Sequence, residues 1–210
     1  MTRTRHPGAE PFLPSKRGVR ALRAAVRDCR GCDLYRAAGQ AVFGAGPRDA
    51  ELMLVGEQPG DVEDRTGNPF TGPAGRVLDR ALNELGLDRD RLYLTNAVKH
   101  FRFRARGKRR IHQRPTLGQT VACRPWLDAE LEAVQPAGIV LLGSLAGQSL
   151  LGSDYRVGDH RGRLLELPGV DAWVVATVHP SAALRADDRE AVHAGLVDDL
   201  RLAADRLARS

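Results

Sequence analysis

Four short apolar runs, separated by segments with helical periodicity, constrain the fold of this chain most strongly. The runs span residues 51–55, 92–98, 138–142 and 173–178, and each has the length of one strand. The helical segments between and after them are residues 74–85, 125–134, 144–151 and 189–207. Strands that alternate with helices imply a mostly parallel sheet with helices on both faces. We therefore expect an α/β fold, a three-layer α/β/α sandwich around a central, mostly parallel four-stranded sheet.

A basic loop follows the second apolar run. Residues 102–114 contain seven Lys/Arg and no acid, and His112 lies near the end of the segment. The whole chain has a formal net charge of only +6, so without this loop it would be near neutral. Such clustering favours a polyanionic partner such as a nucleic-acid backbone, although a solvated basic surface is the simpler alternative. Three apolar residues of this region are expected to be exposed: Phe101, Phe103 and Ile111.

Length and composition place the chain among ordinary globular proteins. It has 210 residues, 42% of them hydrophobic and 28% charged, which fits one domain with a full core. No apolar run approaches the length of a membrane span, and no signal peptide is visible, so we expect no membrane partner. Residues 1–15 are expected to form a flexible basic tail that touches DNA nonspecifically. A helix over 16–27 opens the single domain, 16–210, which also has a weaker strand at 163–167.

The chain contains three cysteines, Cys29, Cys32 and Cys123. An odd number without a secretion signal argues against a disulfide framework. The Cys29-x-x-Cys32 pair instead suggests a metal or redox site. A thioredoxin-like site does not fit, because no strand precedes the pair and no helical pattern starts from it. A metal site requires a fourth ligand.

Polar residues follow three of the expected strands. In parallel α/β sheets ligands bind beyond the carboxyl ends of the strands, so these residues are expected to converge. They are Glu57, Gln58 and Asp61 after the first strand, Asn96 in the second, and His179 and Ser181 after the last. Three other histidines have no such context and are expected at the surface: His6, His160 and His193.

Four of these segments together resemble the iron–sulfur uracil-DNA glycosylases. They are Gly56-Glu57-Gln58-Pro59-Gly60-Asp61, Gly67-Asn68-Pro69-Phe70, Thr95-Asn96 and His179-Pro180-Ser181. Gln58, together with Lys108-Arg109-Arg110-Ile111-His112, resembles the UdgX branch, whose members excise uracil and stay covalently attached to the DNA. The resemblance covers residues 27–200, nearly all of the expected domain.

The resemblance implies a [4Fe–4S] cluster. Members of the family usually have four cysteine ligands, and Cys29, Cys32 and Cys123 match three of them. His100 occupies the place of the remaining one, and histidine can replace cysteine on such a cluster, as in Rieske centres. The expected ligands are therefore Cys29, Cys32, His100 and Cys123. Zinc is the alternative metal, since three cysteines and one histidine are a common zinc set. Alternatively, His100 is a surface residue and another group fills the fourth position.

The resemblance also implies a pocket for a uracil flipped out of the base stack. Phe70 would stack on the base; the alternative is a core aromatic. Asn96 offers a donor and an acceptor to the N3–H and O4 edge of uracil, an arrangement that cytosine does not match. Its alternative role is a strand-end cap. The other expected base contacts are Gly56, Gln58, Asp61 and Glu63, the last guarding against the thymine methyl.

Three residues are expected to act on the glycosidic bond. His179 would hydrogen-bond uracil O2 and hold the leaving anion, while Glu57 would stabilise the cationic sugar or orient a water or histidine. His112 would attack the anomeric carbon. The glycosyl imidazole that results is a poor leaving group, so the protein would stay attached, unlike an enzyme with a carboxylate nucleophile. The alternative is that His112 contacts a phosphate. The expected DNA-binding residues are Lys108, Arg109 and Arg110.

We therefore expect a single-turnover uracil-DNA glycosylase that ends covalently bound to its product through His112. Its partner would be uracil-containing DNA, preferably single-stranded because no base pair has to be broken. We expect a monomer in the bacterial cytoplasm, at the nucleoid when bound to DNA. One rival is a multiple-turnover glycosylase that uses a water activated by Glu57. A rival of another class is a noncatalytic nucleic-acid-binding module with a structural metal.

Overall fold

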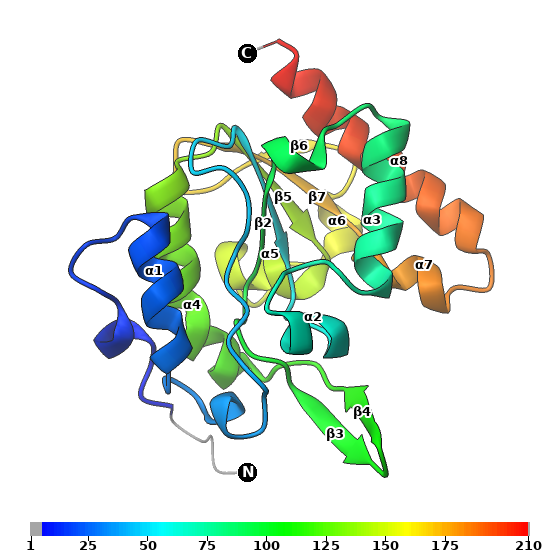
Figure 1. Cartoon of the computed structure of the whole chain (residues 1–210). Coiled ribbons are helices and arrows are strands. Elements are labelled where there is room, and N and C mark those ends of the chain that lie inside the picture. Colours follow the sequence, from blue (N-terminus) through cyan, green and yellow to red (C-terminus); the bar gives the residue numbers. More distant parts are fainter. Residues whose placement is uncertain (1–5, 210) are drawn as a thin grey trace.

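The computed structural model describes residues 6–209 and has a five-stranded sheet at its centre (Figure 1). The strand order is β2-β1-β5-β7-β6. The first four strands are parallel, and β6 pairs antiparallel with β7. The expected α/β fold with a mostly parallel sheet is confirmed, and the weaker strand adds a fifth, edge strand. The strands are β1 (Leu52–Gly56), β2 (Tyr93–Asn96), β5 (Gly138–Leu142), β6 (Leu164–Glu166) and β7 (Trp173–Thr177).

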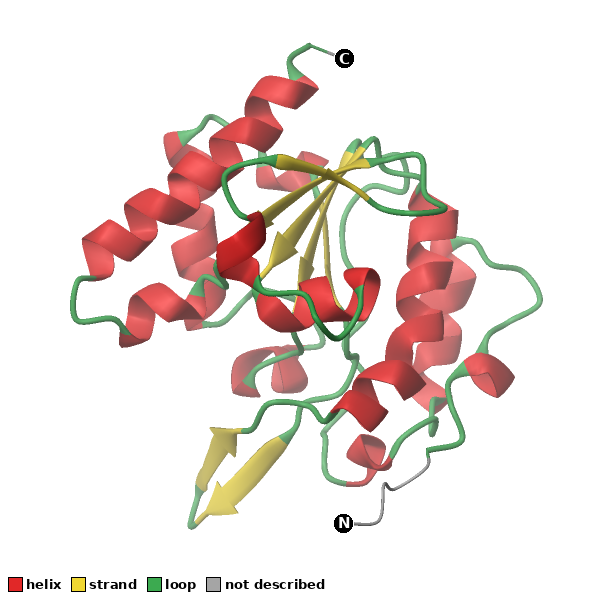
Figure 2. Ribbon diagram, turned by 180° about the vertical axis from the view of Figure 1, so that it is seen from behind, coloured by secondary structure: helices red, strands yellow, loops and turns green. Residues whose placement is uncertain are grey.

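Helices cover both faces of this sheet, which forms the middle layer (Figure 2). Met53 and Val55 of β1 face a core shared with α1, α4 and α5. Leu52 and Leu54 face the opposite core, formed with α3 and α8. Because both faces are covered, β1, β2 and β5 are buried throughout. The helices are α1 (Val19–Ala25), α2 (Asp61–Thr66), α3 (Pro73–Glu84), α4 (Leu117–Val134), α5 (Ser144–Leu151), α6 (Val157–His160), α7 (Ser181–Arg185) and α8 (Arg189–Leu207).

The expected basic loop is a β-hairpin, which corrects the prediction for residues 102–114. Its strands β3 (Phe103–Arg106) and β4 (Arg109–His112) pair antiparallel. Residues 103–106 alternate between apolar and charged, as strand residues do, and Gly107 supplies the positive φ of the tight turn (φ 58°). Charged residues dominate the segment, so its sequence indicates a solvated loop more strongly than a strand. The hairpin projects from the carboxyl end of the parallel strands (Figures 1 and 2).

Helix α4 begins well before the expected start at residue 125. Thr116 and Gln119 form a capping box: the Thr116 hydroxyl accepts the Gln119 N–H, and Gln119 Oε1 accepts the Thr116 N–H. Pro125 lies inside the helix instead of opening it. Within residues 6–209, no helix is sufficiently long and apolar to cross a membrane.

Part of the expected tail is packed on the domain. Residues 1–5 lie outside the described residues. The Gly8 N–H donates to the carbonyl of Gly31 over 3.0 Å, and Ala9 is fully buried. The second half of the segment 1–15 is therefore attached to the loop that carries Cys29 and Cys32. Four short 3₁₀ helices complete the structure: η1 (Glu10–Phe12), η2 (Val26–Asp28), η3 (Asp33–Arg36) and η4 (Arg89–Arg91).

Candidate active site

Gly56 forms the floor of a site at the carboxyl ends of β1 and β2. It pairs in register with Asn96, the last residue of β2. A Cβ at residue 56 would lie 2.6 Å from Cζ of Phe70 and closer still to Oδ1 of Asn96. Only glycine therefore permits both side chains to approach this point. Asn96 and Phe70 are both buried. The residue predicted to read the base edge and the residue predicted to stack on the base therefore both lie against Gly56.

Phe70 is held in a strained conformation. Its φ is 55°, a left-handed value that is uncommon for a bulky residue. The guanidinium of Arg89 donates to the carbonyls of Pro69 (3.3 Å) and Phe70 (3.0 Å) and pairs with Asp79. Gly75 allows the Phe70 carbonyl to approach α3, because a Cβ there would overlap that oxygen. Such strain persists only where the surroundings enforce it, and it concentrates at functional sites. Nothing in the sequence pattern distinguishes Arg89 from a surface arginine.

His179 lies beside Phe70, just after β7. The two rings are 6.5 Å apart and nearly parallel, at 28°. The Ser181 N–H donates to Nδ1 of His179 over 3.2 Å, and the Ser181 hydroxyl lies 2.8 Å from the same nitrogen. A backbone N–H can only donate, so Nδ1 is the acceptor and Nε2 carries the hydrogen of the neutral ring. Burial, together with the positive fields of His112 and Arg185, lowers the pKa of His179 to about 4.

Glu57 follows Gly56 at the strand end. Burial raises the pKa of its carboxyl, and the nearby Arg114 and Arg185 oppose that shift. Within the described part of the chain, its Oε1 is buried and has no hydrogen-bond partner. Nε2 of His112 lies 3.7 Å from this oxygen, beyond hydrogen-bonding distance. This carboxylate oxygen is thus available to a group that binds beside the two side chains.

His112 reaches the site from the end of β4. Its side chain is half-exposed, and its ring centroid lies 6.0 Å from that of the buried Phe101. Partial burial and the field of Arg185 lower the pKa of His112 below its usual value. A neutral imidazole is the form that a nucleophile requires. Phe101 was expected to be exposed; instead it stacks on Phe103 with a centroid distance of 5.2 Å.

The Gln58 side chain is hydrogen-bonded to the two ends of the hairpin. Its Oε1 accepts the backbone N–H of Arg102 over 2.8 Å. Its Nε2 donates to the carbonyls of Arg102 (3.2 Å) and Gln113 (3.0 Å) and lies 2.8 Å from Nε2 of His112. Gln58 therefore connects the two ends of the hairpin with the imidazole. The expected base contact of its side chain remains a prediction.

Two of the expected base-contacting acids are engaged by other groups. Glu63 accepts the backbone N–H groups of Gly60 (3.1 Å) and Gly72 (2.8 Å), one with each oxygen. These two hydrogen bonds connect the turn before α2 with the turn before α3. Asp61 forms ion pairs with Arg65 (3.0 Å) and Arg110.

The predicted DNA-binding arginine Arg110 is a bridge within the protein. It pairs with Asp61 and with the buried Asp64, and its guanidinium lies over the rings of Phe101 (5.5 Å) and Phe103 (5.1 Å). Because side chains alternate along a strand, Arg110 and His112 lie on the inner face of β4. The opposite face carries exposed side chains: Arg104, Arg106, Arg109 and Ile111. Lys108, in the turn, is exposed as well.

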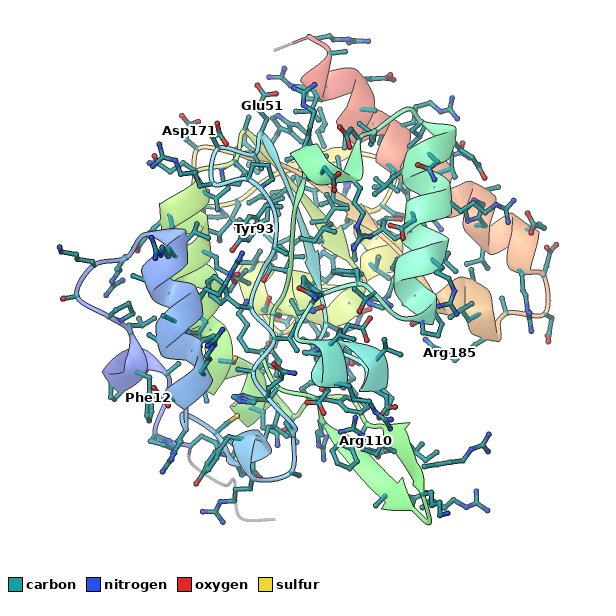
Figure 3. The ribbon with its side chains drawn as sticks, in the orientation of Figure 1. Phe12, Glu51, Tyr93, Arg110, Asp171 and Arg185 are labelled. Atoms are coloured by element: carbon teal, nitrogen blue, oxygen red, sulfur yellow. The ribbon has the colours of Figure 1, made fainter. Side chains whose placement is uncertain are left out.

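Arg185 is a site residue that sequence reasoning missed. It ends α7, and Figure 3 shows it in the lower right of the view, as it does Arg110. Its charge acts on Glu57, His112 and His179. Its place six residues after His179 is the only signal in the sequence, and it is too general to identify a site residue.

The three cysteines are buried and near enough for their charges to interact. Burial raises the pKa of Cys32 to about 11 and that of Cys123 to about 12. The indole N–H of Trp126 donates to Sγ of Cys29 (3.1 Å), and the Lys99 N–H donates to Sγ of Cys123 (3.3 Å). Directed N–H donors of this kind stabilise metal-bound thiolates and tune iron–sulfur clusters.

His100, the fourth predicted ligand, is buried rather than at the surface. Burial lowers the pKa of its imidazole to about 4, which keeps the ring neutral. Within residues 6–209, however, no three His, Cys, Asp or Glu side chains converge as a single bound metal ion requires. The donor types suit a metal, although the described residues form no group that could hold a single ion.

A buried ion pair is linked to Asn96, and sequence reasoning did not identify it. Lys99 and Glu130 are both fully buried and paired. Nζ of Lys99 also donates to the carbonyl of Asn96 (2.7 Å), and Glu130 accepts the hydroxyls of Tyr93 (3.0 Å) and Thr95 (2.9 Å). Since the Lys99 N–H bonds Cys123, this network connects the cysteines to Asn96.

The histidines expected at the surface are not free surface residues. His193 is buried, with Nε2 lying 3.0 Å from a carboxylate oxygen of Glu84. His160 stacks on Tyr155 with a centroid distance of 4.8 Å. The His6 side chain is only 7% exposed and lies 3.8 Å from Asp33. All three have structural contacts away from the strand-end site.

Comparison with known proteins identifies relatives for this arrangement. The sequence profile described as the uracil DNA glycosylase superfamily matches residues 43–201. The type-4 uracil-DNA glycosylase of Saccharolobus solfataricus is 36% identical over 166 residues, which is 76% of this chain and 74% of that protein. Type-4 uracil-DNA glycosylase of Thermotoga maritima is 35% identical over 161 residues (76% and 80%), and type-5 uracil-DNA glycosylase of Pyrobaculum aerophilum is 34% identical over 179 residues (77% and 74%). The chain therefore belongs to the uracil-DNA glycosylase superfamily, in the branch that resembles the type-4 enzymes.

Proposed function

We propose that this protein is a uracil-DNA glycosylase that excises uracil from DNA and remains linked through His112 to the abasic sugar. The observation that carries the covalent part is the place of His112, whose Nε2 lies 3.7 Å from the unpartnered Oε1 of Glu57. An imidazole and a carboxylate thus lie side by side at the strand ends, which would suit a nucleophile and the group that stabilises the sugar. The similarity to type-4 and type-5 uracil-DNA glycosylases supports the excision part.

Recognition of the base begins with Phe70, Asn96 and His179. Phe70 would stack on the flipped uracil, and the Asn96 amide would read the N3–H and O4 edge. The Ser181 N–H fixes His179 with a hydrogen on Nε2, so this imidazole can donate to uracil O2. As the glycosidic bond breaks, negative charge develops on the base, and this donor would stabilise it.

Capture would follow on the sugar. The C1′–N1 bond breaks, its electron pair leaves with uracil, and positive charge develops at C1′ beside the Glu57 carboxylate. A lone pair of the neutral His112 imidazole then forms a bond to C1′. The glycosyl imidazolium loses its remaining N–H proton to solvent, which the half-exposed ring reaches. The neutral glycosyl imidazole that results is a poor leaving group, so hydrolysis would be very slow.

We also propose a [4Fe–4S] cluster bound by Cys29, Cys32, His100 and Cys123. The buried thiols, their N–H donors and the neutral His100 support this assignment. Zinc is the alternative occupant, since three cysteines and one histidine are also a common zinc set. The cluster would be structural, anchoring the chain just before the hairpin.

The DNA partner would contact the exposed cations of the hairpin, among them Lys108 and Arg109. Their exposure supports phosphate binding, and a single-stranded substrate would avoid the free energy of breaking a base pair. We further propose that the protein acts as a monomer in the bacterial cytoplasm, at the nucleoid when bound to DNA.

The stoichiometry of uracil release distinguishes this proposal from its rivals. With a tenfold excess of uracil-containing oligonucleotide over protein, we expect release to stop at one uracil per protein. Continued release would identify a multiple-turnover glycosylase that uses a water activated by Glu57. No release, with salt-sensitive DNA binding retained, would identify a noncatalytic binding module with a structural metal.

A further inference from the structure

Gln58 is the residue through which the strand-end site holds the hairpin. It is only 6% exposed, and every polar atom of its carboxamide contacts the hairpin ends. The hairpin is closed at the same place by the Gln113 N–H, which donates to the Arg102 carbonyl over 2.9 Å. The Gln58 side chain therefore has one orientation, set by backbone groups.

This orientation defines which atom of the carboxamide faces His112. The Arg102 N–H can only donate, so the Gln58 atom opposite it is the oxygen, Oε1. The carbonyls of Arg102 and Gln113 can only accept, so the other atom is the amide nitrogen, Nε2. His112 Nε2 lies 2.8 Å from this donor and must accept. The neutral His112 ring then carries its hydrogen on Nδ1.

The two imidazoles of the site are consequently opposite tautomers. Ser181 gives His179 a hydrogen on Nε2, as a donor to a uracil carbonyl needs. The amide of Gln58 favours the His112 tautomer that has its lone pair on Nε2, and a lone pair is what attack on a carbon atom requires. The Gln58 amide has two hydrogens for three acceptors, so it can release His112 and still satisfy both carbonyls.

We propose that Gln58 is the positioning residue that selects the Nδ1–H tautomer of His112, making Nε2 the atom that attacks the sugar. This inference rests on the proposed covalent function. In the DNA-free protein the Gln58 amide covers the lone pair, and the arriving sugar displaces it. The lone pair then forms the Nε2–C1′ bond, the C1′–N1 pair leaves with uracil, and the Nδ1 proton passes to water.

The wild-type protein without DNA provides the first test. Long-range ¹H–¹⁵N spectra of protein labelled at histidine distinguish Nδ1–H, Nε2–H and imidazolium forms. The His112 signals are identified by their loss in His112→Ser. We expect the Nδ1–H form above the pKa of His112, and the Nε2–H form would overturn the proposal. The charged or titratable groups that act on this ring are Glu57, His179 and Arg185.

A charge-matched pair of variants provides the second test. Gln58→Glu replaces the amide donor with a carboxylate acceptor and should move the His112 proton from Nδ1 to Nε2. Covalent capture at pH 7 should then be about 100-fold slower or more, because a catalytic histidine in the wrong tautomer slows a serine protease by roughly 10⁴-fold. Gln135→Glu makes the same change in an exposed side chain at the end of α4, and should keep the wild-type tautomer and rate. Equal capture rates in wild type and Gln58→Glu would overturn the proposal.

The two tests separate this inference from the proposed function. If His112 is in the Nδ1–H form but no covalent DNA complex forms, the covalent function fails, and the assignment of Nε2 as the attacking atom fails with it. If a complex forms but its sugar is attached to Nδ1, the covalent function holds and the tautomer assignment is overturned. The wild-type spectrum and adduct give these answers even if Gln58→Glu does not fold.

Discussion

Oε1 of Glu57 lies 3.7 Å from Nε2 of His112, and within the described residues this buried oxygen has no hydrogen-bond partner. A buried acceptor without a partner is costly unless another group satisfies it during function. A cationic sugar that lies beside both atoms would be stabilised by the carboxylate and open to attack by the imidazole. Burial raises the pKa of Glu57, and the neighbouring arginines keep that rise limited.

Glu57→Gln should therefore slow uracil excision by roughly 10²-fold or more, because it removes the charge that stabilises the sugar while preserving the shape. Single-turnover release of uracil measures this rate. Glu132→Gln is the matched control, since Glu132 is an exposed residue of α4 that pairs with Arg17 at 3.3 Å. Comparable rates for Glu57→Gln and the wild type would exclude a catalytic role for this carboxylate.

Gly56→Ala should impair binding of the base while preserving the fold. The added Cβ would occupy space that Phe70 and Asn96 now fill, so one of them must move. We expect the DNA concentration that gives half the maximal single-turnover rate of uracil release to rise at least about tenfold, corresponding to roughly 1.4 kcal/mol of lost binding. Gly158→Ala is the control, because a Cβ there meets nothing within 4 Å. An unchanged half-saturating concentration in Gly56→Ala would mean that the base does not lie on this floor.

Arg109 and Arg110 are neighbours on β4 with opposite orientations, and their substitutions should have different effects. Arg110→Ala removes the bridge to Asp61 and Asp64, so the hairpin should loosen and capture should slow at every salt concentration. Arg109→Ala removes an exposed cation, so it should reduce the salt dependence of DNA binding by about 0.7 to 0.9 in log–log slope. Stopped-flow binding and single-turnover capture separate these effects. If Arg110→Ala instead reduced the salt dependence of DNA binding, and Arg109→Ala slowed capture at every salt concentration, Arg110 would be the residue that contacts DNA.

The pH dependence of capture follows from two histidines whose pKa values lie below the ordinary value of about 6.5. Both rings should be mostly neutral at pH 7, so the capture rate should fall in acidic solution, below the ordinary histidine pKa, as His112 gains a proton. Between about pH 6.5 and 4 the folded protein binds fewer protons at His179 than the unfolded chain, so stability also falls with acid. Thermal unfolding at each pH separates the two losses. A capture rate that rises with acid would contradict this assignment.

Several elements were predictable from the sequence because their patterns are local. The strand 138–142 and the helices 144–151 and 189–207 were predicted with the bounds that the structure has. Apolar periodicity suffices where a strand is buried on both faces or a helix covers a core. The hairpin was missed because its alternation is between arginines and only two apolar residues, Phe103 and Ala105, so charge dominated the pattern.

Contacts within the site were less predictable than its location. The convergence of polar residues at the strand ends follows from topology, but the partner of each side chain does not. Arg110 was expected on DNA and lies between Asp61 and Asp64, because register and strand orientation decide its face. The Lys99–Glu130 pair joins a strand end to a helix 31 residues away, and neither residue has a local signal. Such pairs become visible only when the elements are packed.

The most direct test of the covalent role of His112 is a denaturing gel of protein mixed with uracil-containing single-stranded oligonucleotide, with intact mass spectrometry of any shifted band. The wild-type protein should give a heat- and detergent-resistant one-to-one complex whose mass equals protein plus abasic DNA. The variant His112→Ser should give no such band, although it is expected to release uracil. A wild-type protein that releases uracil repeatedly without forming the band would contradict the account, and so would an undiminished band in His112→Ser.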